Sequence, residues 1–119
     1  MSSRPEELRD RTKAFALRVI RLFRSSPYRT DTQVLGKQLL RCGTSVAANY
    51  RAACRARSKA EFVARIAIVA EEADEAVLWL ELLIESGIRK SELTVGLLRE
   101  AKELTAILTA SRQTARKSA

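Results

Sequence analysis

The chain has 119 residues, which is enough for one domain with a single modest hydrophobic core. Hydrophobic residues make up 46% of it and there are only 4 glycines and 2 prolines, which argues against a disordered chain and favours an all-helical one. The 22 lysines and arginines outnumber the 14 acids and leave a net charge of +8. That charge favours a polyanionic partner, meaning RNA, DNA or an anionic membrane. The alternative is a basic surface that binds no such partner.

No apolar run is long enough for a transmembrane helix, and the N-terminus lacks the apolar core of a signal peptide. We therefore expect a cytoplasmic protein. The two cysteines, Cys42 and Cys54, fall on one predicted helix about 18 Å apart along its axis, too far for a disulfide. We expect both to be reduced and to lie in the core or in an interface.

The first predicted helix covers about residues 5–24. Ser3-Arg4-Pro5-Glu6 has the form of a capping box with proline in the first turn, which predicts a helix start. Ser26-Pro27 predicts its end, because proline cannot continue a helix. Between these signals, apolar residues recur at helical spacing: Leu8, Phe15, Val19 and Leu22.

The second predicted helix covers about residues 32–55, with Asp31 placed to favour its positive end. Gly36 and Gly43 lie inside it and each costs about 1 kcal/mol relative to alanine, which indicates the close approach of another helix. One side of this helix is apolar: Leu35, Leu39, Cys42, Val46, Asn49, Tyr50 and Ala53. The opposite side carries four bases: Lys37, Arg41, Arg51 and Arg55.

The third predicted helix covers about residues 58–86, from a capping box at Ser58 to a stop at Ser86-Gly87. Its predicted core stripe is Phe62, Ile66, Val69, Ala73, Val77, Leu80 and Ile84. The fourth covers about residues 91–111, with a stripe formed by Leu97, Ala101, Leu104 and Leu108. Residues 112–119 are predicted to be a frayed basic tail. Short connections between amphipathic helices predict one all-α domain over residues 1–119, an antiparallel up-down-up-down four-helix bundle.

Some apolar residues of the third helix lie outside its core stripe. Leu78, Trp79 and Leu82 fall on the side that also carries Glu71 and Glu85. Tryptophan and leucine are costly to expose on a monomer and suit the core of a subunit interface. We therefore predict that these three residues form a homo-oligomer interface. Packing beneath the N-terminal segment or beneath the loop at Pro27 is the alternative.

Charge is segregated along the chain. Residues 37–65 contain seven bases and one acid, whereas residues 66–88 contain six acids and no base. The basic surface could bind the phosphates of RNA or DNA, or it could pair with the acidic face of a neighbouring subunit. Zinc-finger spacing and aromatic RNA-binding motifs are missing, so nucleic-acid binding would be to the backbone. The candidate nucleic-acid-binding residues are Lys37, Arg41, Arg51, Arg55, Arg57 and Lys59.

The residue content of the chain gives little support for enzymatic activity. The chain has no histidine, which removes the usual general base and the commonest metal ligand. Glu71, Asp74 and Glu75 share one side of a helix, but a solvated or ion-paired acidic surface explains them better than a metal site does. We therefore predict a non-enzymatic protein with no cofactor, no metal, no small-molecule substrate and no membrane partner.

Three segments together resemble a known family: Thr44–Asn49 (TSVAAN), Arg57–Phe62 (RSKAEF) and Trp79–Leu83 (WLELL). They resemble the bacterial four-helix-bundle family of proteins encoded in intervening sequences of 23S rRNA genes, over about residues 15–108. The resemblance implies a small bundle that tends to form homopentamers, with a largely undefined role and no catalytic residues to transfer. The architecture is also similar to that of the basic accessory proteins of diversity-generating retroelements, which associate with a reverse transcriptase and nucleic acid.

The chain departs from the family pattern after Asn49. Many members continue with Ile-Ala-Glu-Gly-x-Gly-Arg, whereas this chain has YRAACRAR at residues 50–57, a change that should make the junction more helical and more basic. We therefore predict an oligomeric protein, with a homopentamer favoured, that binds RNA or a ribonucleoprotein through the basic side of the second helix. The alternative is a structural protein-interaction scaffold, such as an accessory subunit of a larger complex, with no direct contact to nucleic acid.

Overall fold

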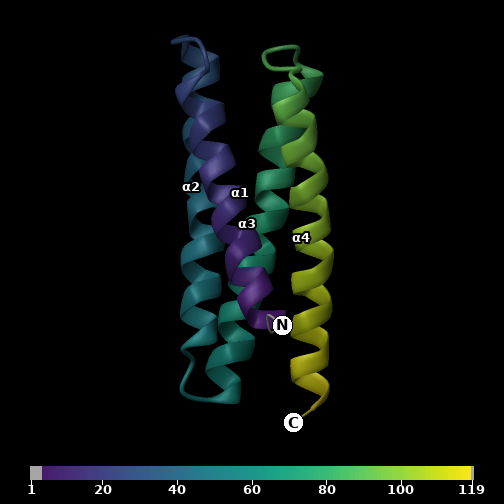
Figure 1. Ribbon diagram of the computed structural model, residues 1–119. Coiled ribbons are helices and arrows are strands. Elements are labelled where there is room, and N and C mark those ends of the chain that lie inside the picture. Colours follow the sequence, from purple (N-terminus) through teal and green to yellow (C-terminus); the bar gives the residue numbers. More distant parts are fainter. Residues whose placement is uncertain (1–3, 119) are drawn as a thin grey trace.

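A computed structural model of the protein describes residues 4–118. It contains four helices: α1 (Arg4–Arg24), α2 (Thr30–Cys54), α3 (Lys59–Glu85) and α4 (Glu92–Lys117). The helices run alternately up and down beside one another, joined by short connections (Figure 1). The predicted all-α four-helix fold is confirmed, and residues 4–118 contain no strand. None of these helices combines the length and the apolarity needed to span a bilayer.

The helix ends follow the local signals in the sequence. The Ser58 hydroxyl accepts a hydrogen bond from the backbone N–H of Glu61 at 3.0 Å, and the Glu61 carboxylate accepts one from the N–H of Arg57 at 3.0 Å. Gly87 follows α3 with a φ of 81°, a left-handed conformation that glycine adopts without strain. Ser91 caps α4 through the N–H of Thr94 at 3.3 Å. The predicted cap at Ser3 lies outside the described residues.

Two helix boundaries differ from the prediction. α2 begins at Thr30 rather than at residue 32, so that Asp31 lies within its first turn and accepts the N–H of Thr32 at 2.7 Å. The prediction of a frayed tail from residue 112 is wrong, because α4 continues to Lys117. Basic residues in the last turn of a helix are favoured by the helix dipole. In addition, Thr114 and Ala115 share a hollow with Phe62 of α3.

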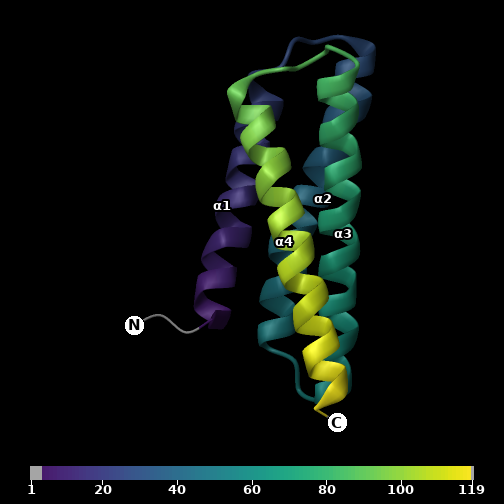
Figure 2. The ribbon, with the colours of Figure 1, turned by 90° about the vertical axis from the view of Figure 1, so that its right-hand side faces the viewer.

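The core lies between α3 and its neighbours. α3 packs closely against α2 on one side and against α4 on the other, whereas α1 packs mainly against α2. Figure 2 shows the N-terminal end of α1 standing apart from α4. The predicted stripes on α1 and α4 are fully buried: Leu8, Phe15, Val19, Leu22, Leu97, Ala101, Leu104 and Leu108. Most of the stripes on α2 and α3 are also buried, although Leu35, Asn49, Phe62, Val77 and Ile84 are only half-buried.

The two glycines inside α2 lie against α1, as the sequence indicates. A Cβ atom added at Gly43 would lie 3.0 Å from Cγ2 and 3.2 Å from Cβ of Val19. At Gly36, it would lie 2.8 Å from the Phe23 ring. Because these distances are shorter than ordinary van der Waals contacts, a larger residue at either position would require the α1 side chain opposite it to shift.

We predict that Gly43→Ala lowers the free energy of unfolding by about 1 kcal/mol, because overpacking against the stiff, fully buried Val19 outweighs the gain in helix propensity. Gly96→Ala is the matched control, because its Cβ would meet only the flexible end of Arg18. The control should keep or raise stability by up to about 1 kcal/mol. Urea unfolding followed by circular dichroism measures both. A Gly43→Ala protein as stable as the wild type would contradict the packing argument.

Candidate nucleic-acid interface

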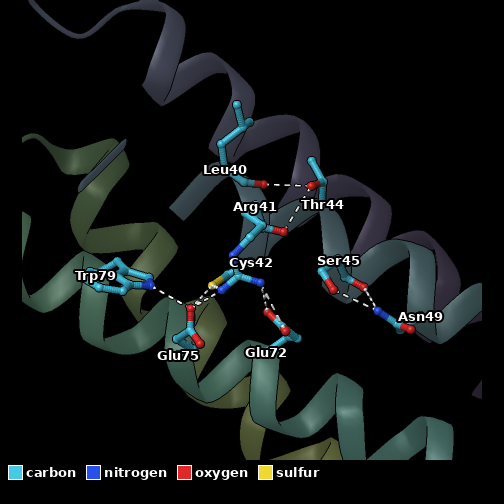
Figure 3. Close-up of polar contacts among 9 residues, drawn as sticks. All are labelled: Leu40, Arg41, Cys42, Thr44, Ser45, Asn49, Glu72, Glu75 and Trp79. Atoms are coloured by element: carbon cyan, nitrogen blue, oxygen red, sulfur yellow. Dashed lines mark hydrogen bonds and ion pairs between the residues drawn. The ribbon is translucent and has the colours of Figure 1, made fainter. Parts of the chain in front are cut away.

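Arg41 is engaged within its own chain. Its Nη1 atom lies 3.2 Å from a Glu72 carboxylate oxygen, and its Nη2 atom forms a hydrogen-bonded ion pair with Glu75 (Figure 3). Both acids belong to α3. One of the predicted phosphate-binding residues is therefore partly neutralised by acids across the α2–α3 contact.

Glu75 is the centre of a polar network. Its carboxylate also accepts hydrogen bonds from the Cys42 thiol at 2.7 Å and from the Trp79 indole N–H at 3.1 Å (Figure 3). These two hydrogen bonds, followed by the charge of Arg41, lower the pKa of Glu75. Burial raises the pKa of Cys42 to about 12, so its thiol stays protonated at neutral pH and can donate.

The same network contains the one group of metal-ligating atoms found among residues 4–118. The ligand atoms of Cys42, Glu72 and Glu75 lie within 4.8 Å of one another. The guanidinium of Arg41 already binds both carboxylates, so an ion pair accounts for the arrangement. Of the three acids singled out in the sequence, Glu75 belongs to this group, whereas Glu71 and Asp74 are exposed and lie outside it.

Asn49 and Ser45, which lie in one of the segments that carry the family resemblance, have structural partners. The Asn49 amide donates to the Ser45 hydroxyl at 2.8 Å and to the Ser45 carbonyl at 3.0 Å (Figure 3). Arg65 of α3 donates to the Asn49 side-chain oxygen at 3.4 Å. The Arg65 contact joins α2 to α3 about two turns from the Arg41 ion pairs, and together these contacts give Asn49 a packing role.

Four predicted phosphate-binding residues gather at the end of the bundle where α2 connects to α3. Arg51 and Arg55 come from the end of α2, Arg57 from the connection and Lys59 from the start of α3, and all four are exposed. The C-terminal end of α4 lies at the same end of the molecule (Figures 1 and 2). Lys37 does not belong to this group, because it precedes Arg51 by about 21 Å along the helix axis.

Two adjoining grooves surround Arg51 and Arg55. The larger, of about 770 Å³, lies between α1 and α2, and the smaller, of about 410 Å³, extends over the α2–α3 connection to Arg57. Ala48 lines both of them. Beside these small and basic side chains, the larger groove is lined by residues of both charges and by further small residues: Glu6, Arg9, Asp10, Lys13, Ala16, Thr44 and Ala47.

In the described part of the chain, Arg51, Arg55 and Arg57 take part in no ion pair. Between residues 4 and 118, the basic partners in ion pairs are Arg11, which binds Glu100 and Glu103, and Arg41. Sequence reasoning found Arg51, Arg55 and Arg57 from their charge. It missed the groove, because the contribution of α1 depends on how that helix packs against α2.

The three predicted interface residues occupy different environments. Leu78 is 47% exposed and Leu82 is 40% exposed, so no described part of the chain covers them fully. Trp79 is half-buried against the core, and its indole is bound by Glu75. The alternative of packing beneath the loop at Pro27 therefore does not account for the two leucines.

We predict that Glu75→Gln changes the fluorescence of Trp79, the only tryptophan of the chain, whereas the control Glu72→Gln does not. The pKa of Glu75 is lowered from its ordinary value of 4.5, so its carboxylate stabilises the fold above that pH. This contribution should be lost as the pH falls through the lowered pKa. Urea unfolding at pH 7 should show Glu75→Gln to be less stable than the wild type, with the difference vanishing in acid. A difference that persists in acid would contradict the network.

Comparison with known proteins identifies the family of this chain. The family model described as 23S rRNA-intervening sequence protein matches residues 6–110. A search of curated proteins finds no match. The chain is similar to a crystal structure of a protein with unknown function from the S23 ribosomal protein family of Bacteroides thetaiotaomicron, with 31% identity and a TM-score of 0.80. The alignment covers 88% of this chain and 97% of the other. The chain therefore belongs to the 23S rRNA-intervening sequence protein family.

Proposed function

We propose that the protein binds RNA through the sugar–phosphate backbone at the end of the bundle where α2 connects to α3. The observation that supports this is the group formed by Arg51, Arg55, Arg57 and Lys59. The three arginines line two adjoining grooves, and Lys59 follows Arg57 by two residues. All four bases are exposed and take no part in the ion pairs described above. An arginine side chain presents a planar fork of donors that fits a phosphate group.

The proposed contact is electrostatic rather than a reading of bases. The grooves are lined by charged and small side chains and contain no aromatic ring on which a base could stack. Binding should therefore depend strongly on salt and only weakly on sequence. The family name refers to the intervening sequence of 23S rRNA, which makes structured RNA the first ligand to test. The proposal includes no catalytic step.

We also propose that the protein acts as a homo-oligomer. The exposed Leu78 and Leu82 support this, because paired exposed leucines are costly on a monomer. The family resemblance favours a pentamer. In such an assembly several basic ends could contact one RNA molecule, so that weak individual contacts would add to a higher avidity. The same leucines favour the second candidate, a protein-interaction scaffold without nucleic acid.

We predict that the triple variant Arg51→Ala/Arg55→Ala/Arg57→Ala binds a structured RNA hairpin at least about tenfold more weakly at low salt. The slope of log K against log salt should also become shallower by about one for each phosphate that the variant can no longer neutralise. Fluorescence anisotropy measures both the affinity and the slope. The salt concentration is varied from about 50 to about 200 mM, the range over which phosphate contacts weaken.

The matched control is Lys90→Ala/Arg99→Ala/Lys102→Ala, which removes the same charge from exposed positions of the α3–α4 connection and α4. It should bind RNA with nearly the affinity of the wild type. Equal losses of affinity in the two triple variants would show a general effect of net charge and contradict the proposed site. No binding by the wild type at low salt would remove the RNA proposal and leave the scaffold.

A further inference from the structure

An acidic and apolar ridge runs along the outward side of α3. It consists of exposed residues at helical spacing: Ile68, Glu71, Asp74, Leu78, Leu82 and Glu85. Ile68 is 38% exposed, in addition to the two leucines described above. Its three acids take no part in the ion pairs among residues 4–118, whose acidic partners are Glu72, Glu75, Glu100 and Glu103.

A basic and apolar face lies on the outward side of the α1–α2 pair. Its exposed residues are Leu17, Arg21 and Arg24 from α1 with Val34 and Lys37 from α2. Leu17 is 45% exposed and Val34 is 56% exposed. The one acid of α2, Asp31, accepts a hydrogen bond from the backbone N–H of Thr32.

The α3 ridge and the basic face occupy the same stretch of the bundle axis. Cys42 contacts Glu75 across two antiparallel helices, so Leu82, seven residues further along α3, is level with about residue 35, next to Val34. Likewise, Val19 lies against Gly43, which places Arg24 level with about residue 38, next to Lys37. Two parallel copies could therefore bring the two surfaces together without an axial shift.

We propose that the α3 ridge of one copy docks against the basic face of another copy. This inference rests on the proposed self-association and names the two surfaces that meet. A contact between two ridges would bring carboxylates together, and a contact between two basic faces would bring bases together. Docking of unlike surfaces instead places acids opposite bases. Without an axial shift, Val34 is level with Leu82, and Leu17 is level with about residue 72 of α3, between Ile68 and Leu78. Exposed apolar side chains of the two surfaces therefore meet inside a charged rim.

This docking assigns the contact with another copy and the binding of RNA to different basic residues. Lys37 contacts a neighbouring copy, whereas the bases from Arg51 to Lys59 stay available for RNA at the end of the bundle. Arg41 contributes to neither, since Glu72 and Glu75 hold it within the chain.

Charge reversal tests the docking. The ridge variant is Glu71→Lys/Asp74→Lys/Glu85→Lys, the face variant is Arg21→Glu/Arg24→Glu/Lys37→Glu, and the combined variant carries all six changes. The first three changes add six charges and the other three remove six, so the combined variant keeps the wild-type net charge of +8. Light scattering over a range of concentrations gives the mass of each protein, and circular dichroism checks that it folds.

The wild type should assemble, and each triple variant should associate at least about tenfold more weakly, because attraction becomes repulsion at several pairs. The combined variant should recover assembly, because it restores opposite charges at every contact. A monomeric wild type would overturn the self-association itself. An assembled wild type with unaffected triple variants, or a combined variant that stays dissociated, would overturn only the docking of these two surfaces.

Discussion

The ion pairs that Arg41 makes with Glu72 and Glu75 decide how charge is distributed over the molecule. They join α2 to α3 near the middle of both helices, and they bring Cys42 and Trp79 into one hydrogen-bonded network. They also partly neutralise the central arginine of α2, although its side chain stays exposed. Of the other predicted bases, Lys37 lies toward the start of α2, and the group from Arg51 to Lys59 begins about four helical turns further along.

This division suggests how one small bundle could both assemble and bind a polyanion. The end of α2, its connection and the start of α3 place Arg51, Arg55 and Arg57 around adjoining grooves at one end of the molecule. The sides of the bundle carry surfaces of opposite charge with exposed leucine and valine side chains. Assembly through the sides would leave the basic ends pointing the same way, toward a common ligand.

Local features of the sequence predicted most of the fold. The cap at Ser58 and the fully buried stripe of α4 depend only on neighbours within a helix, so spacing along the chain suffices to find them. The glycine at position 43 also indicated a close helix, although not that Val19 would be the residue in contact. The end of α4 could not be predicted, because its last turns lie beside Phe62 of α3, a neighbour that helical spacing does not reveal.

The candidate site was only partly predictable for a similar reason. Helical periodicity gives the direction in which a side chain leaves its helix, but not which residue of another helix it meets. Arg41 and Lys37 therefore looked equivalent in the sequence. Both are exposed in the structure, but among residues 4–118 only Arg41 forms ion pairs with α3.

The most direct test of this account is to follow the arginine side-chain Nε–H signals by NMR while a structured RNA is added. The account predicts that the signals of Arg51, Arg55 and Arg57 shift or broaden, and that those of Arg11 and Arg41, which are held by ion pairs, stay in place. Shifts centred on Arg41, or equal shifts at every exposed arginine, would contradict it.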